Sequence, residues 1–156
     1  MTRFLIEAAA LHAVERHGEE AFPRECCGLL LGRREAGARR AVRAERARNL
    51  EQERGHDRYL LDPQDRLRAE ERGQRDGLEL VGFYHSHPDH DAYFSPTDLQ
   101  RSEEYQWGEP WVDPSYTYLV TSIRAGRAGR HRAFEVREGR AEELLLEVVG
   151  APEEGP

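Results

Sequence analysis

Short apolar runs along the chain predict a mixture of helices and strands. Apolar residues recur at helical spacing from Phe4 to Val14, and Gly18 follows as a stop, so a helix is predicted over residues 4–17. The segment 26–32 differs, because its apolar residues are nearly continuous and end at a glycine, which is typical of a buried strand. A helix followed by a buried strand is therefore expected at the start of the chain.

Later apolar or alternating runs indicate further strands at residues 39–48, 78–86, 116–123, 131–138 and 141–149. The first and last of these runs would equally suit a helix. Asp62 followed by Pro63 is a helix start, because Asp caps the first turn and Pro fits its first position. That helix is expected to end near Asp76. Residues 95–98 carry a second start signature, for a helix that reaches about Tyr105.

This mixture indicates one domain of the α/β class. Helices combined with a largely antiparallel sheet predict an α/β sandwich, in which helices flank the sheet. The length of 156 residues suits a single core. We assign residues 1–150 to one domain and expect residues 151–156 to form a disordered tail.

Composition restricts the possible partners and the compartment. The net charge is −7, from 30 acidic and 23 basic residues, which argues against a nucleic-acid binder that works by bulk charge. Cys26 and Cys27 are neighbours, and a disulfide between them would be strained, so both are expected to be reduced, as in a cytoplasmic protein. Glu7 interrupts the apolar N-terminus, and neither a signal peptide nor a membrane span is expected.

The segment that carries most chemical information begins at His85. His85 and His87 lie one residue apart at the predicted end of a strand, so both imidazoles should point to one face. Such a pair can chelate a metal. Asp98 would add a third ligand and leave a fourth tetrahedral position to water, as in catalytic zinc sites. Taken alone, however, Ser95 and Asp98 also fit an ordinary capping box at a helix start.

Hydrolysis at such a metal needs a group that takes a proton from water and delivers it to the leaving amine. Glu25 is the preferred candidate, because it opens the first buried strand. Spacing alone does not separate it from Glu79 or Glu103. The hydroxyl of Ser95 is suited to donating a hydrogen bond to the oxyanion that forms on the substrate.

Other residue types leave further alternatives open. Three loop residues could compete as metal ligands: Asp89, His90 and Asp91. The two cysteines are soft zinc ligands by type, but inside an apolar run they are typical of small core residues. Three aromatic residues fit either core packing or a rim that grips an extended substrate: Trp107, Trp111 and Tyr116. The arginine-rich run 33–48 fits a solvated face better than a docking surface.

Together, these residues resemble the motif of the JAB1/MPN/Mov34 zinc metalloproteases (the JAMM or MPN+ family) in its short bacterial form. The motif here consists of Glu25, then His85-Ser86-His87-Pro88, six further residues, Ser95 and Asp98. The resemblance implies one zinc per chain held by His85, His87 and Asp98. It also implies Glu25 as the acid/base, Ser95 as the oxyanion stabiliser, and an MPN-type, cytidine-deaminase-like sandwich with a mostly antiparallel or mixed sheet flanked by helices.

The same resemblance implies a substrate class. Short bacterial members are associated with ubiquitin-like sulfur carriers that end in Gly-Gly, so the implied reaction is hydrolysis of an amide at that tail by zinc-bound hydroxide. The alternatives are a non-catalytic MPN scaffold and a deubiquitinase-like enzyme with another substrate. Retention of all five motif positions argues against the scaffold.

Overall fold

The structure is a computed structural model that describes residues 2–51, 60–93 and 115–150. Its elements in chain order are β1 (Arg3–Glu7), α1 (Ala8–Ala21), β2 (Cys27–Glu35), β3 (Ala38–Ala47), α2 (Pro63–Arg75), β4 (Glu79–Pro88), β5 (Thr117–Arg124), β6 (Arg127–Arg137) and β7 (Arg140–Val149). Residues 94–114 and 151–156 lie outside this description. The expected helix after Ser95 and the expected disordered tail therefore stay predictions.

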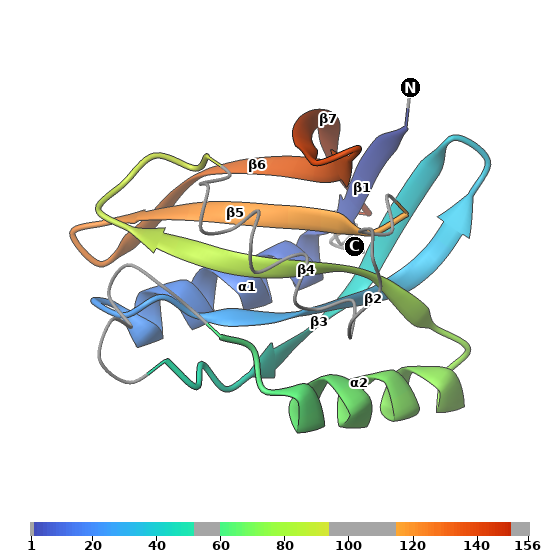
Figure 1. Ribbon diagram of the computed structural model, residues 1–156, viewed down its shortest axis with the longest axis horizontal. Coiled ribbons are helices and arrows are strands. Elements are labelled where there is room, and N and C mark those ends of the chain that lie inside the picture. The colour runs from blue at the N-terminus through green and yellow to red at the C-terminus, as the bar shows by residue number, and fades with distance from the viewer. Residues whose placement is uncertain (1, 52–59, 94–114, 151–156) are drawn as a thin grey trace, which may run out of the picture.

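The strands form one closed barrel in the order β1-β3-β2-β4-β5-β6-β7 (Figure 1). The helix-flanked α/β sandwich expected from the sequence is therefore wrong. The part of the chain that the structure describes consists mostly of strands, with two helices. Closure depends on β1, which pairs in parallel with β3 on one side and with β7 on the other.

The predicted helix over residues 4–17 is wrong in its first part, because residues 3–7 form strand β1. Three consecutive apolar residues from Phe4 to Ile6 are all buried, as expected for a strand with neighbours on both sides rather than for one stripe of a helix. The helix starts only at Ala8 and continues through Gly18, the expected stop. A Cβ atom on Gly18 would lie 2.6 Å from Cδ1 of Ile123, so glycine there permits a close approach of α1 to β5.

The sheet carries a core cluster on each face. Alternate residues of β2 separate between them, because successive side chains on a strand point to opposite faces. Leu30 belongs to the cluster that packs against α1, whereas Leu29 and Leu31 belong to the cluster on the side of α2. Figure 1 shows the two helices on different sides of β2 and β4.

The second helix and the later strands form largely where the sequence predicts them. The Asp62 carboxylate accepts a hydrogen bond from the backbone N–H of Gln64 at 2.8 Å, and α2 begins at Pro63. The two runs that would equally have suited a helix, 39–48 and 141–149, are strands. Each is stabilised by pairing with a strand on both sides in the barrel.

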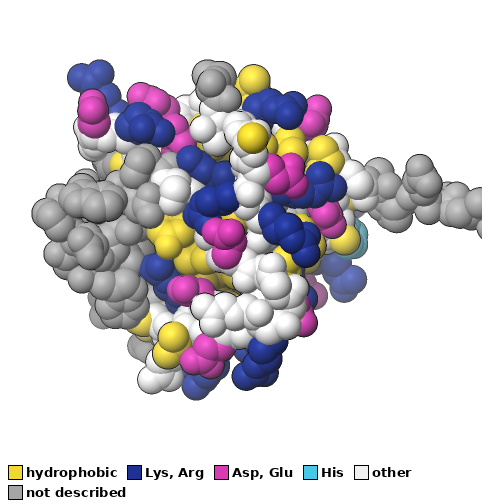
Figure 2. Space-filling view, turned by 90° about the vertical axis from the view of Figure 1, so that its right-hand side faces the viewer, with side chains coloured by type: hydrophobic (Ala, Val, Ile, Leu, Met, Phe, Trp, Pro, Cys, Tyr) yellow, Lys and Arg dark blue, Asp and Glu magenta, His cyan; other side chains and the backbone are white. Residues whose placement is uncertain are grey.

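The surface is a mosaic of charges of both signs. Figure 2 shows arginine and acidic side chains interspersed over one face of the molecule. Several arginines of the 33–48 run pair with carboxylates of other elements, such as Arg40 with Glu7 at 3.1 Å. Arg39 is buried and pairs with Glu135 of β6 at 2.7 Å. Among the described residues, no helix is long and apolar enough to cross a membrane.

Candidate metal centre

Three buried side chains of the motif meet at the ends of β2 and β4. Glu25, His85 and His87 each offer one ligand atom, and these atoms all lie within 4.8 Å of one another. Their exposed fractions are 5%, 1% and 5%, respectively. Within the described residues this is the one group of His, Cys, Asp and Glu side chains that could hold a metal ion.

Strand pairing brings these residues together. β2 and β4 are antiparallel, with Cys27 opposite His85. Two hydrogen bonds extend the pairing by one residue: the backbone N–H of Ser86 donates to the carbonyl of Cys26 at 3.1 Å, and the N–H of Cys26 donates to Oγ of Ser86 at 2.8 Å. This register carries Glu25, the residue before Cys26, toward His87.

The two histidines lie on one face of β4, as strand alternation predicts. Their Nε2 atoms are 3.3 Å apart. Two nitrogens bound to one tetrahedral zinc at the usual bond length of about 2.0–2.1 Å would be separated by about 3.3 Å. The spacing of His85 and His87 therefore fits a shared zinc ion.

The backbone at Glu25 is anchored by Asn49, a residue that no sequence pattern indicated. The side-chain amide of Asn49 donates to the carbonyl oxygen of Glu25 at 3.0 Å. The side-chain oxygen of the same residue accepts from the N–H groups of Glu51 and Leu60 at 3.0 and 2.9 Å. Asn49 therefore joins the residues just before β2, which include Glu25, to the segment that follows β3.

The structure distinguishes Glu25 from Glu79, two of the three acid/base candidates that spacing left open. Glu79 begins β4, at the opposite end from the histidines, and its half-exposed carboxylate pairs with Arg34. Glu25 is the carboxylate that lies beside the two imidazoles. Glu103, Ser95 and Asp98 lie outside the described residues, as do Trp107 and Trp111, so their expected roles stay predictions.

The loop after Pro88 contributes backbone atoms rather than ligands. The metal-capable group contains none of its three candidate side chains. The carbonyl of Asp91 lies 3.0 Å from Nδ1 of His87, and the carbonyl of His90 accepts from Ser122 at 2.6 Å. The Asp91 carboxylate pairs instead with Arg124 at the surface.

The cysteines and Tyr116 are core residues. Both cysteines are free and buried, on opposite faces of the sheet. Burial raises the pKa of the Cys26 thiol to about 12 and that of Cys27 well above its usual range, so both remain protonated. Tyr116 packs edge-on against Phe83, with ring centroids 5.6 Å apart, at the border of the cluster near α2.

On the face of β4 opposite the metal centre, a polar contact attaches the strand to α1. The Tyr84 hydroxyl lies 2.7 Å from Nδ1 of His17 on α1. Burial, and then the charge of Arg46, lowers the pKa of His17 to about 4, whereas burial raises the pKa of Tyr84 well above its usual range. At neutral pH the contact therefore joins a protonated hydroxyl and a neutral imidazole.

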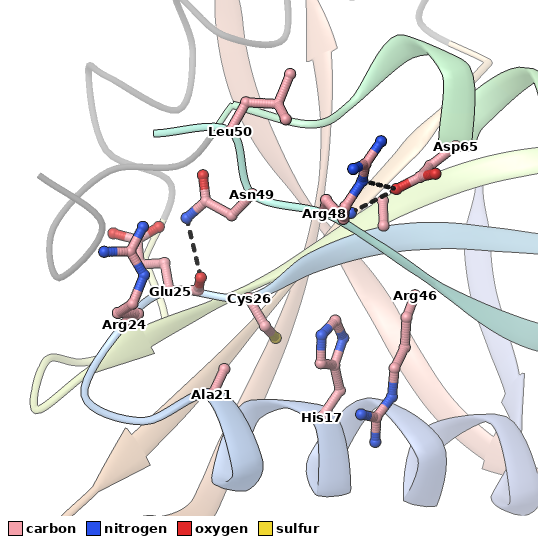
Figure 3. A pocket seen from close by; sticks show the side chains of 11 residues that line it. His17, Ala21, Arg24, Glu25, Cys26, Arg46, Arg48, Asn49, Leu50 and Asp65 are labelled. Carbon is pink, nitrogen blue, oxygen red and sulfur yellow. Dashed lines mark hydrogen bonds and ion pairs between the residues drawn. The ribbon is translucent and has the colours of Figure 1, made fainter. Parts of the chain in front are cut away.

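A cavity of about 570 Å³ opens beside Glu25 (Figure 3). Its walls come from α1, the residues just before β2, the end of β3 with the segment after it, and α2. They include His17, Arg24, Cys26, Arg46 and Asn49. Figure 3 shows Glu25 and Arg24 at one end of this space and His17 and Arg46 at the other. Of the three residues of the metal-capable group, Glu25 alone lines this cavity.

A buried Glu and two His at adjoining strand ends of the barrel form a candidate metal centre. Comparison with known proteins identifies the family of this chain. The model of prokaryotic homologs of the JAB domain matches residues 7–135. The chain belongs to this family, as the sequence motif predicted. The family is generally zinc dependent, in agreement with the candidate Glu/His/His site.

Similar proteins include a desampylase, a peptidase and a probable protease. The desampylase of Haloferax volcanii is 33% identical over 125 residues, which cover 78% of this chain and 81% of that protein. The CysO-cysteine peptidase of Mycobacterium tuberculosis is 30% identical over 146 residues, or 93% and 90% of the two chains. A probable TtuB-protein conjugate cleaving protease of Thermus thermophilus is 43% identical over 54 residues, 35% of this chain and 34% of that one. The chain is thus a hydrolytic enzyme of the peptidase or isopeptidase type.

Solved structures agree with the fold. A protein from Desulfitobacterium hafniense aligns with a TM-score of 0.78 and 25% identity, covering 94% of this chain and 92% of its own. A protein from Salinibacter ruber aligns with a TM-score of 0.65 and 33% identity, covering 100% and 95%.

Proposed function

We propose that the protein is a zinc-dependent peptidase that hydrolyses an amide at the C-terminal Gly-Gly tail of a ubiquitin-like sulfur-carrier protein. The names of its relatives support this substrate class, since they refer to a CysO-cysteine substrate and to TtuB-protein conjugates. The observation that carries the proposal is the 3.3 Å spacing of the His85 and His87 Nε2 atoms beside the buried Glu25.

The proposed zinc ligands are His85, His87 and Asp98, with one zinc per chain. The two histidines fit in donor type and spacing, and Asp98 follows from the sequence motif alone. Zinc, when bound, lowers the pKa of a coordinated water to about 7 and polarises a carbonyl. Water is thereby available as a nucleophile at neutral pH.

Glu25 is the proposed acid/base. Its carboxylate lies with the histidine nitrogens in one group, within reach of a water at the same centre. It would take the proton of the attacking water and deliver it to the amine nitrogen as the amide bond breaks. Ser95 would donate a hydrogen bond to the oxyanion on the former carbonyl.

The cavity beside Glu25 supports an extended substrate. Glycine has no side chain, so a Gly-Gly tail could lie close to a strand end and pair with its backbone. We propose that the tail approaches through this cavity, past Arg24 and Glu25. The two free, buried cysteines are compatible with a reducing compartment, and we propose the cytoplasm.

The test is intact-mass analysis of Gly-Gly-tailed carrier proteins that bear a C-terminal extension, after incubation with the purified protein. We expect a mass loss equal to the residues beyond the second glycine. A carrier whose final glycine is replaced by a bulky residue should be cleaved more slowly. If neither extended nor amino-acid-conjugated carriers lose mass while an unrelated peptide is cleaved, the carrier is the wrong substrate class.

A further inference from the structure

The ring of His87 is fixed by a backbone acceptor. Its Nδ1 lies 3.0 Å from the carbonyl oxygen of Asp91. Because a carbonyl can only accept, the neutral ring must carry its proton on Nδ1. The lone pair is then on Nε2, the atom that faces Nε2 of His85. The Tyr93 ring packs against the imidazole in a T-shaped arrangement, with ring centroids 4.9 Å apart, and confines it further.

The carbonyl that fixes His87 belongs to a loop, and β5 holds this loop in place. The N–H of Asp89 donates to the carbonyl of Ile123 at 2.6 Å, and the Asp89 carboxylate accepts from the N–H of Ala125 at 2.9 Å. Asp89 has a φ of 57°, in the left-handed region that non-glycine residues rarely adopt. The loop therefore has a defined conformation that depends on contacts to β5.

A part-buried hydrogen bond joins Ser122 to His90, the residue before Asp91. The Ser122 hydroxyl donates to the carbonyl of His90 at 2.6 Å, and Ser122 is 4% exposed. Ser122 also lies where the register between β5 and β6 shifts, between Thr121 and Ile123. Irregularities of this kind often re-aim a side chain next to an active site. The pair between Arg124 and Asp91, by contrast, is exposed and hence weakened by solvent.

We infer that Ser122 is a positioning residue for the metal centre: its hydroxyl holds the carbonyl of the His90–Asp91 peptide, and the Asp91 carbonyl of the following peptide sets the tautomer and orientation of His87. The inference rests on the proposed function, since it requires that His87 bind zinc. It adds a residue outside the sequence motif and assigns the short loop after Pro88 a role in metal affinity. Removing outer-shell contacts of histidine ligands commonly lowers metal affinity about 10–100-fold.

The test compares Ser122→Ala with Thr121→Val in the full-length protein. Thr121 is the matched control, because its buried hydroxyl is bonded to His131 at 2.9 Å rather than to the loop. Zinc affinity is measured by competition with a chromophoric chelator. Ring ¹⁵N shifts of the zinc-free protein report the His87 tautomer. We expect Ser122→Ala to bind zinc about 10-fold or more weakly and to lose part of its Nδ1–H population. Thr121→Val should change neither quantity.

Ser122→Cys covers the case in which the alanine variant does not fold. It keeps a side chain of similar size with a weaker donor, so its zinc affinity should lie between those of the wild type and the alanine variant. Wild-type affinity and an unchanged tautomer in the folded Ser122 variants would overturn the inference. Neither readout involves cleavage, so a wild type that binds zinc but cleaves no carrier would contradict the proposed substrate alone. A wild type that binds no zinc would overturn the metal centre and this inference together.

Discussion

The two faces of β4 use polar side chains differently. On one face, His85 and His87 gather with Glu25 so that ligand atoms of three residues lie within 4.8 Å. On the other, Tyr84 contacts His17 and Ser86 binds the backbone of Cys26. The first face brings together groups that suit a metal, whereas the second uses its hydroxyls to attach the strand to α1 and β2.

This difference shows how one short segment can serve chemistry and stability at once. Because successive residues of a strand alternate between faces, the run from Tyr84 to His87 supplies both functions without conflict. Changes on the metal face should therefore affect zinc and turnover, and changes on the helix face should affect stability.

Loss of a histidine on the metal face should have the largest effect. We expect His85→Ala to lose zinc and, with it, cleavage of the carrier, while the fold is retained. Metal analysis of dialysed protein measures the first effect. His17→Gln, on the helix face, is the control and should retain one zinc per chain. Full zinc occupancy in His85→Ala would remove that residue from the site.

Glu25→Gln should separate metal binding from catalysis. The amide keeps the shape of the side chain but cannot accept the water proton, so turnover should fall by at least about 10²-fold. Zinc content should stay at the wild-type level. Glu79→Gln provides the comparison, since that carboxylate lies at the far end of β4 and should leave the rate unchanged. Equal rates for Glu25→Gln and wild type would exclude Glu25 as the acid/base.

On the helix face, His17 should make stability depend on pH. Its pKa is lowered to about 4 in the fold from 6.5, so between these values the unfolded chain binds the additional proton. The contribution of His17 is therefore complete above about pH 6.5 and is lost as pH falls toward 4. Urea unfolding across this range should show a steeper loss for wild type than for His17→Gln. Identical slopes would contradict the buried, neutral state of His17.

Tyr84→Phe should have the smallest effect. It removes one hydroxyl from a buried hydrogen bond and should lower the free energy of unfolding by about 1 kcal/mol. Zinc affinity and turnover should stay unchanged, because the hydroxyl is on the opposite face of β4 from His85 and His87. A loss of zinc in this variant would show that the two faces are coupled.

Local patterns predicted the parts of the molecule that depend on local rules. The spacing of His85 and His87 determined their common face, and Asp62-Pro63 marked the start of α2. The barrel was missed because β1 is stabilised by pairing with β3 and β7, which are distant in sequence. Asn49 gave no signal either, because a side chain that binds a distant backbone carbonyl leaves no periodic pattern.

If the proposed metal centre is correct, hydrolysis depends on zinc held at His85 and His87. The most direct test of this dependence is the rate of carrier cleavage before zinc removal, after removal by a chelator, and after one equivalent of zinc is restored. We expect cleavage to stop in the zinc-free protein and to return with the added metal. Undiminished cleavage by protein shown to be free of metal would contradict this dependence.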